Sequence, residues 1–128
     1  MNWNDETVRR PSVLLIDDEP EFARLMERAL GDDFIVTTAA DGLDGYALLC
    51  QDHPDVVLLD VMMPLIDGWS VLQKIRSNRA VSHVPVIVVT GLSAEAATHE
   101  SMRHGVTRIL HKPILPSQLI KAIRDALG

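Results

Sequence analysis

Short apolar segments recur along this chain and alternate with stretches that have helical periodicity. Five segments are expected to be strands, at about 12–17, 35–37, 55–60, 85–90 and 107–111. The first, third and fourth are apolar at nearly every position, which is typical of strands whose two faces are both covered by helices. Five alternations of strand and helix predict an α/β domain, a (βα)5 doubly wound fold with a parallel five-stranded sheet.

The helical patterns differ in strength along the chain. Pro20 stands at the start of the first one, where its missing N–H costs nothing. The fourth, over about 94–104, has a thin apolar face, so we expect it to be loosely held and movable. The fifth begins at Pro116, and its predicted inner face consists of Leu119, Ile120, Ile123 and Leu127.

Four of the predicted strands end in side chains that suit metal or phosphoryl chemistry. The first runs into Asp17 and Asp18, and the third into Asp60; the fourth ends at Thr90, and the fifth leads to Lys112. The carboxyl ends of parallel strands meet at one edge of an open sheet, the edge where such sheets bind ligands. Three carboxylates, one hydroxyl and one ammonium are therefore expected to share a pocket.

This combination points to Mg²⁺ and phosphate. Carboxylates a few ångströms apart raise one another's pKa, and a divalent cation relieves the repulsion. Mg²⁺ prefers oxygen ligands, and an aspartate can accept a phosphoryl group. Lys112 would supply positive charge for phosphoryl oxygens, and Thr90 a hydroxyl donor. A single charged residue at a strand end is more often a solvated turn residue, so the inference depends on all four strand ends together.

The composition narrows the class of protein. With 128 residues the chain suits one domain, expected at 12–128 behind a polar lead-in at 1–11. A net charge of −6 argues against direct nucleic-acid binding. No segment is long and apolar enough to span a membrane, and the first ten residues do not resemble a secretory signal. A single cysteine fits a reducing compartment, so we expect a cytoplasmic location.

The same residues carry a family resemblance. Asp17-Asp18, the run Asp60-Val61-Met62-Met63-Pro64-Leu65-Ile66-Asp67-Gly68, Thr90 and Lys112-Pro113 match in order and spacing. On these motifs the chain resembles the receiver domain of two-component response regulators, from about Ser12 to Leu127. The resemblance implies a flavodoxin-like strand order, 2-1-3-4-5.

The resemblance also implies roles for individual residues. Asp60 would accept a phosphoryl group from a histidine kinase or a histidine phosphotransfer protein. Asp18, Asp60 and the backbone carbonyl of Met62 would be direct Mg²⁺ ligands, with Asp17 acting through water. Lys112 would hold the phosphoryl group, and Thr90 would move toward it as the switch.

Three further expectations come from the family. The Lys112-Pro113 peptide bond is often cis in receivers. The output partner is a protein or domain that the sequence does not identify. A homodimer through the face made by the fourth predicted helix (94–104), the fifth strand and the fifth helix is common in the family, and the sequence leaves it open.

Three positions distinguish this chain within the family pattern. Receivers usually carry Tyr or Phe shortly before the lysine, whereas this chain has Ile109, which we expect to pack in the last strand. Signal output would then rely on the loop after Thr90 and on the helix at 94–104. Met62 and Leu92, which flank the phosphoryl group in the family, are apolar and cannot orient an attacking water, so slow self-dephosphorylation is expected.

Two other functions compete with the phosphorylation switch. One is a Mg²⁺-dependent phosphatase with Asp60 as nucleophile, similar to the haloacid dehalogenase class. That class needs an acid/base Asp two residues later, where this chain has Met62, and the chain is short for a substrate cap. The other is a scaffold that is not phosphorylated, against which the complete set of site residues counts. We therefore expect no turnover of a free substrate.

Overall fold

The computed structural model describes residues 9–63, 67–91 and 105–128. The helix predicted at 94–104, its expected mobility and Leu92 lie outside these residues. Nine elements follow one another in the described part of the chain: β1 (Ser12–Ile16), α2 (Pro20–Leu30), β2 (Ile35–Ala39), α3 (Gly42–Asp52), β3 (Val56–Leu59), α4 (Gly68–Ser77), β4 (Val86–Thr90), β5 (Arg108–His111) and α6 (Pro116–Leu127).

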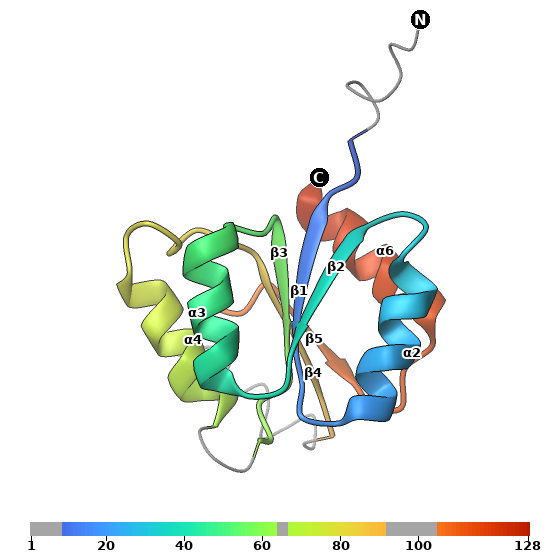
Figure 1. Ribbon diagram of the computed structural model, residues 1–128, viewed down its shortest axis with the longest axis horizontal. Helices are drawn as coiled ribbons and strands as arrows, with labels where there is room; N and C mark the ends of the chain where they lie inside the picture. The colour runs from blue at the N-terminus through green and yellow to red at the C-terminus, as the bar shows by residue number, and fades with distance from the viewer. Residues whose placement is uncertain (1–8, 64–66, 92–104) are drawn as a thin grey trace, which may run out of the picture.

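The five strands form one parallel sheet in the order β2-β1-β3-β4-β5. The predicted flavodoxin-like α/β fold and its strand order are therefore confirmed. All five strands end at the same edge of the sheet, the lower edge in Figure 1. β1 and β3 are each slightly shorter than predicted, and their aspartates lie just beyond the assigned strands.

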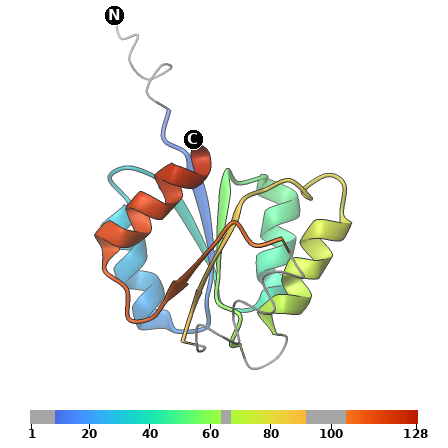
Figure 2. The ribbon, with the colours of Figure 1, turned by 180° about the vertical axis from the view of Figure 1, so that it is seen from behind.

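Helices cover both faces of the sheet, as the apolar strands predict. α2 and α6 lie on one face and α3 and α4 on the other (Figures 1 and 2). Alternate residues of β1 supply the two cores: Val13 and Leu15 pack toward α2 and α6, and Leu14 and Ile16 toward α3 and α4. Each fully buried Leu, Ile or Val contributes about 1.5–3 kcal/mol through its removal from water, so the sheet is rigidly held between its helices.

Ile109, the residue at the position where receivers usually carry an aromatic ring, packs in the last strand as predicted. It pairs with Val88 of β4 and is partly buried against the core on the α3 and α4 side. Trp69 of α4 is partly buried against the same core. Ile109 therefore serves the packing of the edge strand.

Candidate metal and phosphoryl site

The sheet itself positions the two buried aspartates. The amide of Asp17 donates to the carbonyl of Ala39 at 3.0 Å, and the amide of Asp60 donates to the carbonyl of Ile16 at 2.9 Å. Both bonds continue the ladder hydrogen bonding of the parallel sheet past the last strand residues. The two carboxylates therefore leave adjacent strands, β1 and β3, at the same level of the sheet edge.

Each of these carboxylates is also held by a local turn. Oδ1 of Asp17 accepts from the amide of Glu19, and Oδ1 of Asp60 accepts from the amide of Met62, both at 2.9 Å. A side chain that accepts from the amide two residues later closes an Asx turn, which restricts its rotamer. In each case one oxygen is occupied by the chain, and the other, Oδ2, faces Lys112.

Lys112 enters the site from the end of β5. Its amide donates to the carbonyl of Thr90 at 2.8 Å, which joins the ends of β4 and β5. Thr90 is completely buried at the end of β4. The Lys112-Pro113 peptide bond is cis, as the family resemblance implied.

The Lys112 ammonium lies among three carboxylates of the site. Nζ lies 2.8 Å from Oδ2 of Asp17 and 3.4 Å from Oδ2 of Asp60, and it also contacts the carboxylate of Glu19. It sits 4.4 Å from the centre of the Phe22 ring. An ammonium over a ring face is stabilised electrostatically, so the aromatic side chain from α2 supports the same position.

Burial controls the electrostatics of this group. The side chains of Asp17 and Asp60 are 0% and 5% exposed, and that of Lys112 is 16% exposed. Burial raises the pKa of both aspartates, and their bonds to Lys112 and to backbone amides offset only part of that effect. Burial alone would lower the pKa of Lys112, but the hydrogen bonds and charges of the carboxylates outweigh it and raise the pKa.

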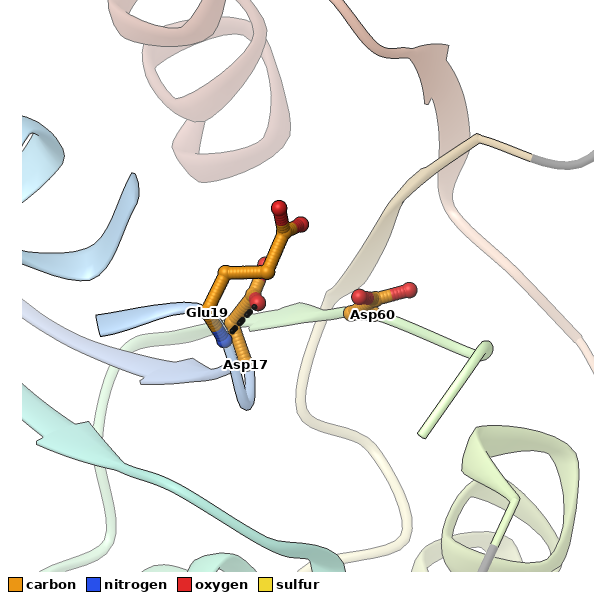
Figure 3. A group of neighbouring side chains, drawn as sticks. All are labelled: Asp17, Glu19 and Asp60. Carbon is orange, nitrogen blue, oxygen red and sulfur yellow. Dashed lines mark hydrogen bonds between the residues drawn. The ribbon is translucent and has the colours of Figure 1, made fainter. Parts of the chain in front are cut away.

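A third carboxylate completes the group, and the sequence argument missed it. Oxygens of Asp17, Glu19 and Asp60 lie within 4.8 Å of one another (Figure 3). The predicted third member, Asp18, is partly buried beside them, and its side chain makes no hydrogen bond or ion pair within the described residues. The turn that Asp17 closes, with a bend at Asp18, brings Glu19 to the site, because the amide of Glu19 is held against the Asp17 carboxylate.

The donor set fits a divalent cation. Two buried carboxylates and one exposed carboxylate share a single ammonium, so the group carries excess negative charge. Oxygen donors of this kind are the ligands that Mg²⁺ prefers. The side chain of Met62 is 54% exposed and does not fill the site.

Comparison with known proteins identifies the family. The sequence-family model of the response regulator receiver domain matches residues 13–124 of this chain. The chain belongs to this family. Response regulator PleD of Caulobacter vibrioides is 34% identical to it over 114 residues, which cover 88% of the chain and 25% of PleD. The probable transcriptional regulator ycf27 of Guillardia theta is 37% identical over 119 residues, which cover 92% of the chain and 46% of that protein.

Solved structures agree with this assignment. Chemotaxis protein CheY4 of Vibrio cholerae superposes with a TM-score of 0.87 at 28% identity, covering 92% of this receiver domain and 99% of CheY4. The BeF3-activated receiver domain of RstA from Klebsiella pneumoniae superposes with a TM-score of 0.83 at 26% identity, covering 91% of this chain and 97% of that one. The chain spans about a quarter to a half of the length of the curated relatives named above. In the part of the receiver domain that the structure describes, no helix has the length and hydrophobicity to cross a membrane.

The excess negative charge predicts that Asp60→Asn stabilises the receiver domain when no metal is bound. The folded pKa of Asp60 is raised above its ordinary value of 3.8, so its carboxylate opposes folding once it is ionised. We expect the free energy of unfolding at pH 7 to rise by about 1 kcal/mol in the variant. Urea denaturation in a chelating buffer measures it.

The pH dependence of the stabilisation by Asp60→Asn tests whether the raised pKa of Asp60 causes it. A carboxyl group whose pKa is raised by folding contributes to the free energy of unfolding in acid, where it is protonated. That contribution is lost as the pH rises through the pKa of the folded state. The stability gap between Asp60→Asn and the unmodified protein should therefore open as the pH rises above about 4 and close below it. A variant that is less stable at neutral pH would contradict this account.

Proposed function

We propose that Asp60 is the phosphoacceptor of this receiver domain and that its donor is a histidine kinase or a histidine phosphotransfer protein. One observation carries the proposal: the ammonium of Lys112 faces Oδ2 of both Asp17 and Asp60 at the carboxyl edge of the sheet. A carboxylate oxygen of Asp60 would attack phosphorus as the bond to the donor imidazole breaks. The product is an acyl phosphate, and the released imidazole takes up a proton.

Mg²⁺ is the proposed cofactor. Asp18, Asp60 and the backbone carbonyl of Met62 would hold it directly, and Asp17 would act through water. When bound, the ion supplies the positive charge that lets a carboxylate approach phosphoryl oxygens. The two buried carboxylates of Asp17 and Asp60, with the exposed carboxylate of Glu19 beside them, support this role.

Lys112 and Thr90 would act on the phosphoryl group itself. Lys112 holds a positive charge at the end of β5, next to the carboxylates, and would pair with phosphoryl oxygens. Thr90 would donate its hydroxyl to them and act as the switch. The phosphoryl group then has to favour one of two conformations, which typically takes about 1–3 kcal/mol of differential binding.

The signal would pass to a protein surface. Relatives of this receiver domain include the DNA-binding dual master transcriptional regulator RpaA of Synechocystis and the hybrid signal transduction histidine kinase D of Dictyostelium discoideum. We propose a cytoplasmic switch, with its domain at 12–128, that acts on a partner protein or an attached domain. Dimerisation through the face made by the helix predicted at 94–104, β5 and α6 is a second proposed output.

Acetyl phosphate tests the proposed function. The protein is incubated with Mg²⁺ and acetyl phosphate, and its intact mass and the released phosphate are followed. We expect a gain of one phosphoryl group per chain, absent in Asp60→Asn and absent without Mg²⁺. Continuous release of phosphate over many turnovers would instead indicate a phosphatase, and no mass gain under any condition would indicate a scaffold.

Met62 predicts a long-lived phosphorylated state. Its side chain is exposed next to Asp60, and a thioether cannot orient a water molecule for attack on phosphorus. We expect Met62→Asn to shorten the lifetime of phosphorylated Asp60 by about threefold to tenfold, while Met62→Leu leaves it unchanged. Decay of the phosphorylated mass after removal of acetyl phosphate gives both lifetimes. Equal lifetimes in the two variants would refute the role of Met62.

A further inference from the structure

The hydrogen-bonding capacity of Lys112 is fully used before any phosphoryl group arrives. An ammonium has three N–H donors. Three carboxylates, those of Asp17, Glu19 and Asp60, lie within bonding or ion-pair distance of Nζ. A phosphoryl oxygen that binds Lys112 must therefore displace one of them.

The three carboxylates differ in how easily they can leave. Asp17 is fully buried, and its other oxygen accepts from the chain. Asp60 is 5% exposed, and it is the residue that would carry the phosphoryl group. The Glu19 side chain is 58% exposed, so water can replace the ammonium as its partner. Glu19 is the partner whose release costs least.

We propose that Glu19 is a positioning residue that latches Lys112 in the unphosphorylated protein and must swing away when Asp60 is phosphorylated. This inference rests on the proposed function. The latch holds the ammonium beside Asp60, but it also occupies the donor that the phosphoryl group requires. A glutamate this close to Asp60 also repels a phosphoryl dianion.

The chain permits this movement without rebuilding the site. The amide of Glu19 donates to Asp17, which anchors the backbone, and the side chain extends from that point (Figure 3). Glu19 is the N-cap residue of α2, and its side chain makes no capping hydrogen bond there. Rotation of the Glu19 side chain therefore breaks one exposed ion pair and leaves helix and turn intact.

Three variants separate the latch from general electrostatics. Glu19→Gln removes the charge, and Glu19→Asp keeps the charge but shortens the side chain by one methylene group. Glu21→Gln is the matched control, because Glu21 is an exposed carboxylate in the first turn of the same helix. All are tested as the full chain with Mg²⁺ and acetyl phosphate, and with BeF3⁻ as a phosphoryl mimic.

The latch predicts a defined pattern of rates and affinities. An exposed ion pair is worth up to about 1 kcal/mol, so Glu19→Gln should be phosphorylated about two to five times faster and bind BeF3⁻ about two to five times more tightly. Glu19→Asp should resemble Glu19→Gln, and Glu21→Gln should match the unmodified protein. The Mg²⁺ affinity, measured by calorimetry without phosphoryl donor, should match that of the unmodified protein in Glu19→Asp and Glu21→Gln. It should fall by no more than about threefold in Glu19→Gln, which removes one negative charge near the ion.

Other outcomes overturn the latch. If Glu19→Asp matches the unmodified protein while Glu19→Gln is faster, charge alone acts and reach to Lys112 is irrelevant. If Glu19→Gln loses more than about threefold in Mg²⁺ affinity and reacts more slowly, Glu19 is a metal ligand. If all variants react alike, Glu19 has no role in the reaction. In each of these cases Asp60→Asn still reports on the proposed function, because loss of its mass gain is independent of Glu19.

Discussion

Replacing Lys112 with methionine should have the largest effect of any single change at the site. We expect the metal-free variant to lose about 2–4 kcal/mol of unfolding free energy at pH 7, and its phosphorylation by acetyl phosphate to slow by at least about a hundredfold. The ammonium is the only cation that contacts Asp17 and Asp60 within the described residues. Without it, two buried carboxylates remain with no counter-charge.

The same change should alter the response to pH and to Mg²⁺. The pKa values of Asp17 and Asp60 are already raised by burial, and loss of the ammonium raises them further. The loss of unfolding free energy relative to the unmodified protein should therefore disappear in acid, where the carboxylates are protonated. It should increase as the pH rises through their pKa values. Added Mg²⁺ should restore stability at neutral pH but should not restore the phosphorylation rate.

Lys121→Met provides the control for lost positive charge. Lys121 lies on α6, is 73% exposed, and pairs only with Asp125 on the same helix among the described residues. An exposed pair of this kind contributes about 0.3–0.5 kcal/mol, so this variant should stay within about 0.5 kcal/mol of the unmodified protein. The prediction for Lys112 fails if the two variants lose equal stability in urea denaturation.

Gly68→Ala should disrupt the site by displacing the backbone of Asp60 and Val61. A Cβ atom at Gly68 would lie 2.4 Å from the Cα of Val61 and 2.6 Å from the carbonyl oxygen of Asp60. These are backbone atoms of the loop that follows β3, so they cannot rotate away as a side chain can. We expect a loss of about 3 kcal/mol or more in unfolding free energy, measured by urea denaturation, and a phosphorylation rate reduced by displacement of Asp60.

Two other glycines calibrate this prediction. At Gly45 an added Cβ would first meet side-chain atoms of Ile16, so Gly45→Ala should cost less, about 1–2 kcal/mol. At Gly91 nothing lies within 4 Å among the described residues, so Gly91→Ala should be nearly neutral. A Gly68→Ala variant as stable as Gly91→Ala would show that the loop after Asp60 yields to the added methyl group.

Much of the fold was predictable because its determinants are local. Apolar runs that end in aspartate, threonine or lysine identify buried strands and their carboxyl ends, and the strand at 85–90 was predicted within one residue of β4. The strand order came from family resemblance, since hydrophobic periodicity does not state which strands are neighbours. Ile109 was expected to pack in the last strand, and the structure places it partly buried against the core.

The sequence by itself determined which chemical groups reach the carboxyl edge of the sheet, because strand ends follow from hydrophobic patterning. Only the tertiary structure decided which carboxylates face the ammonium. Lys112 lies 93 residues from Glu19 in the chain, and their contact depends on the direction of the backbone after β1. The turn closed by the Asp17 side chain places Glu19 beside it, a choice that the order of three consecutive acidic residues does not reveal.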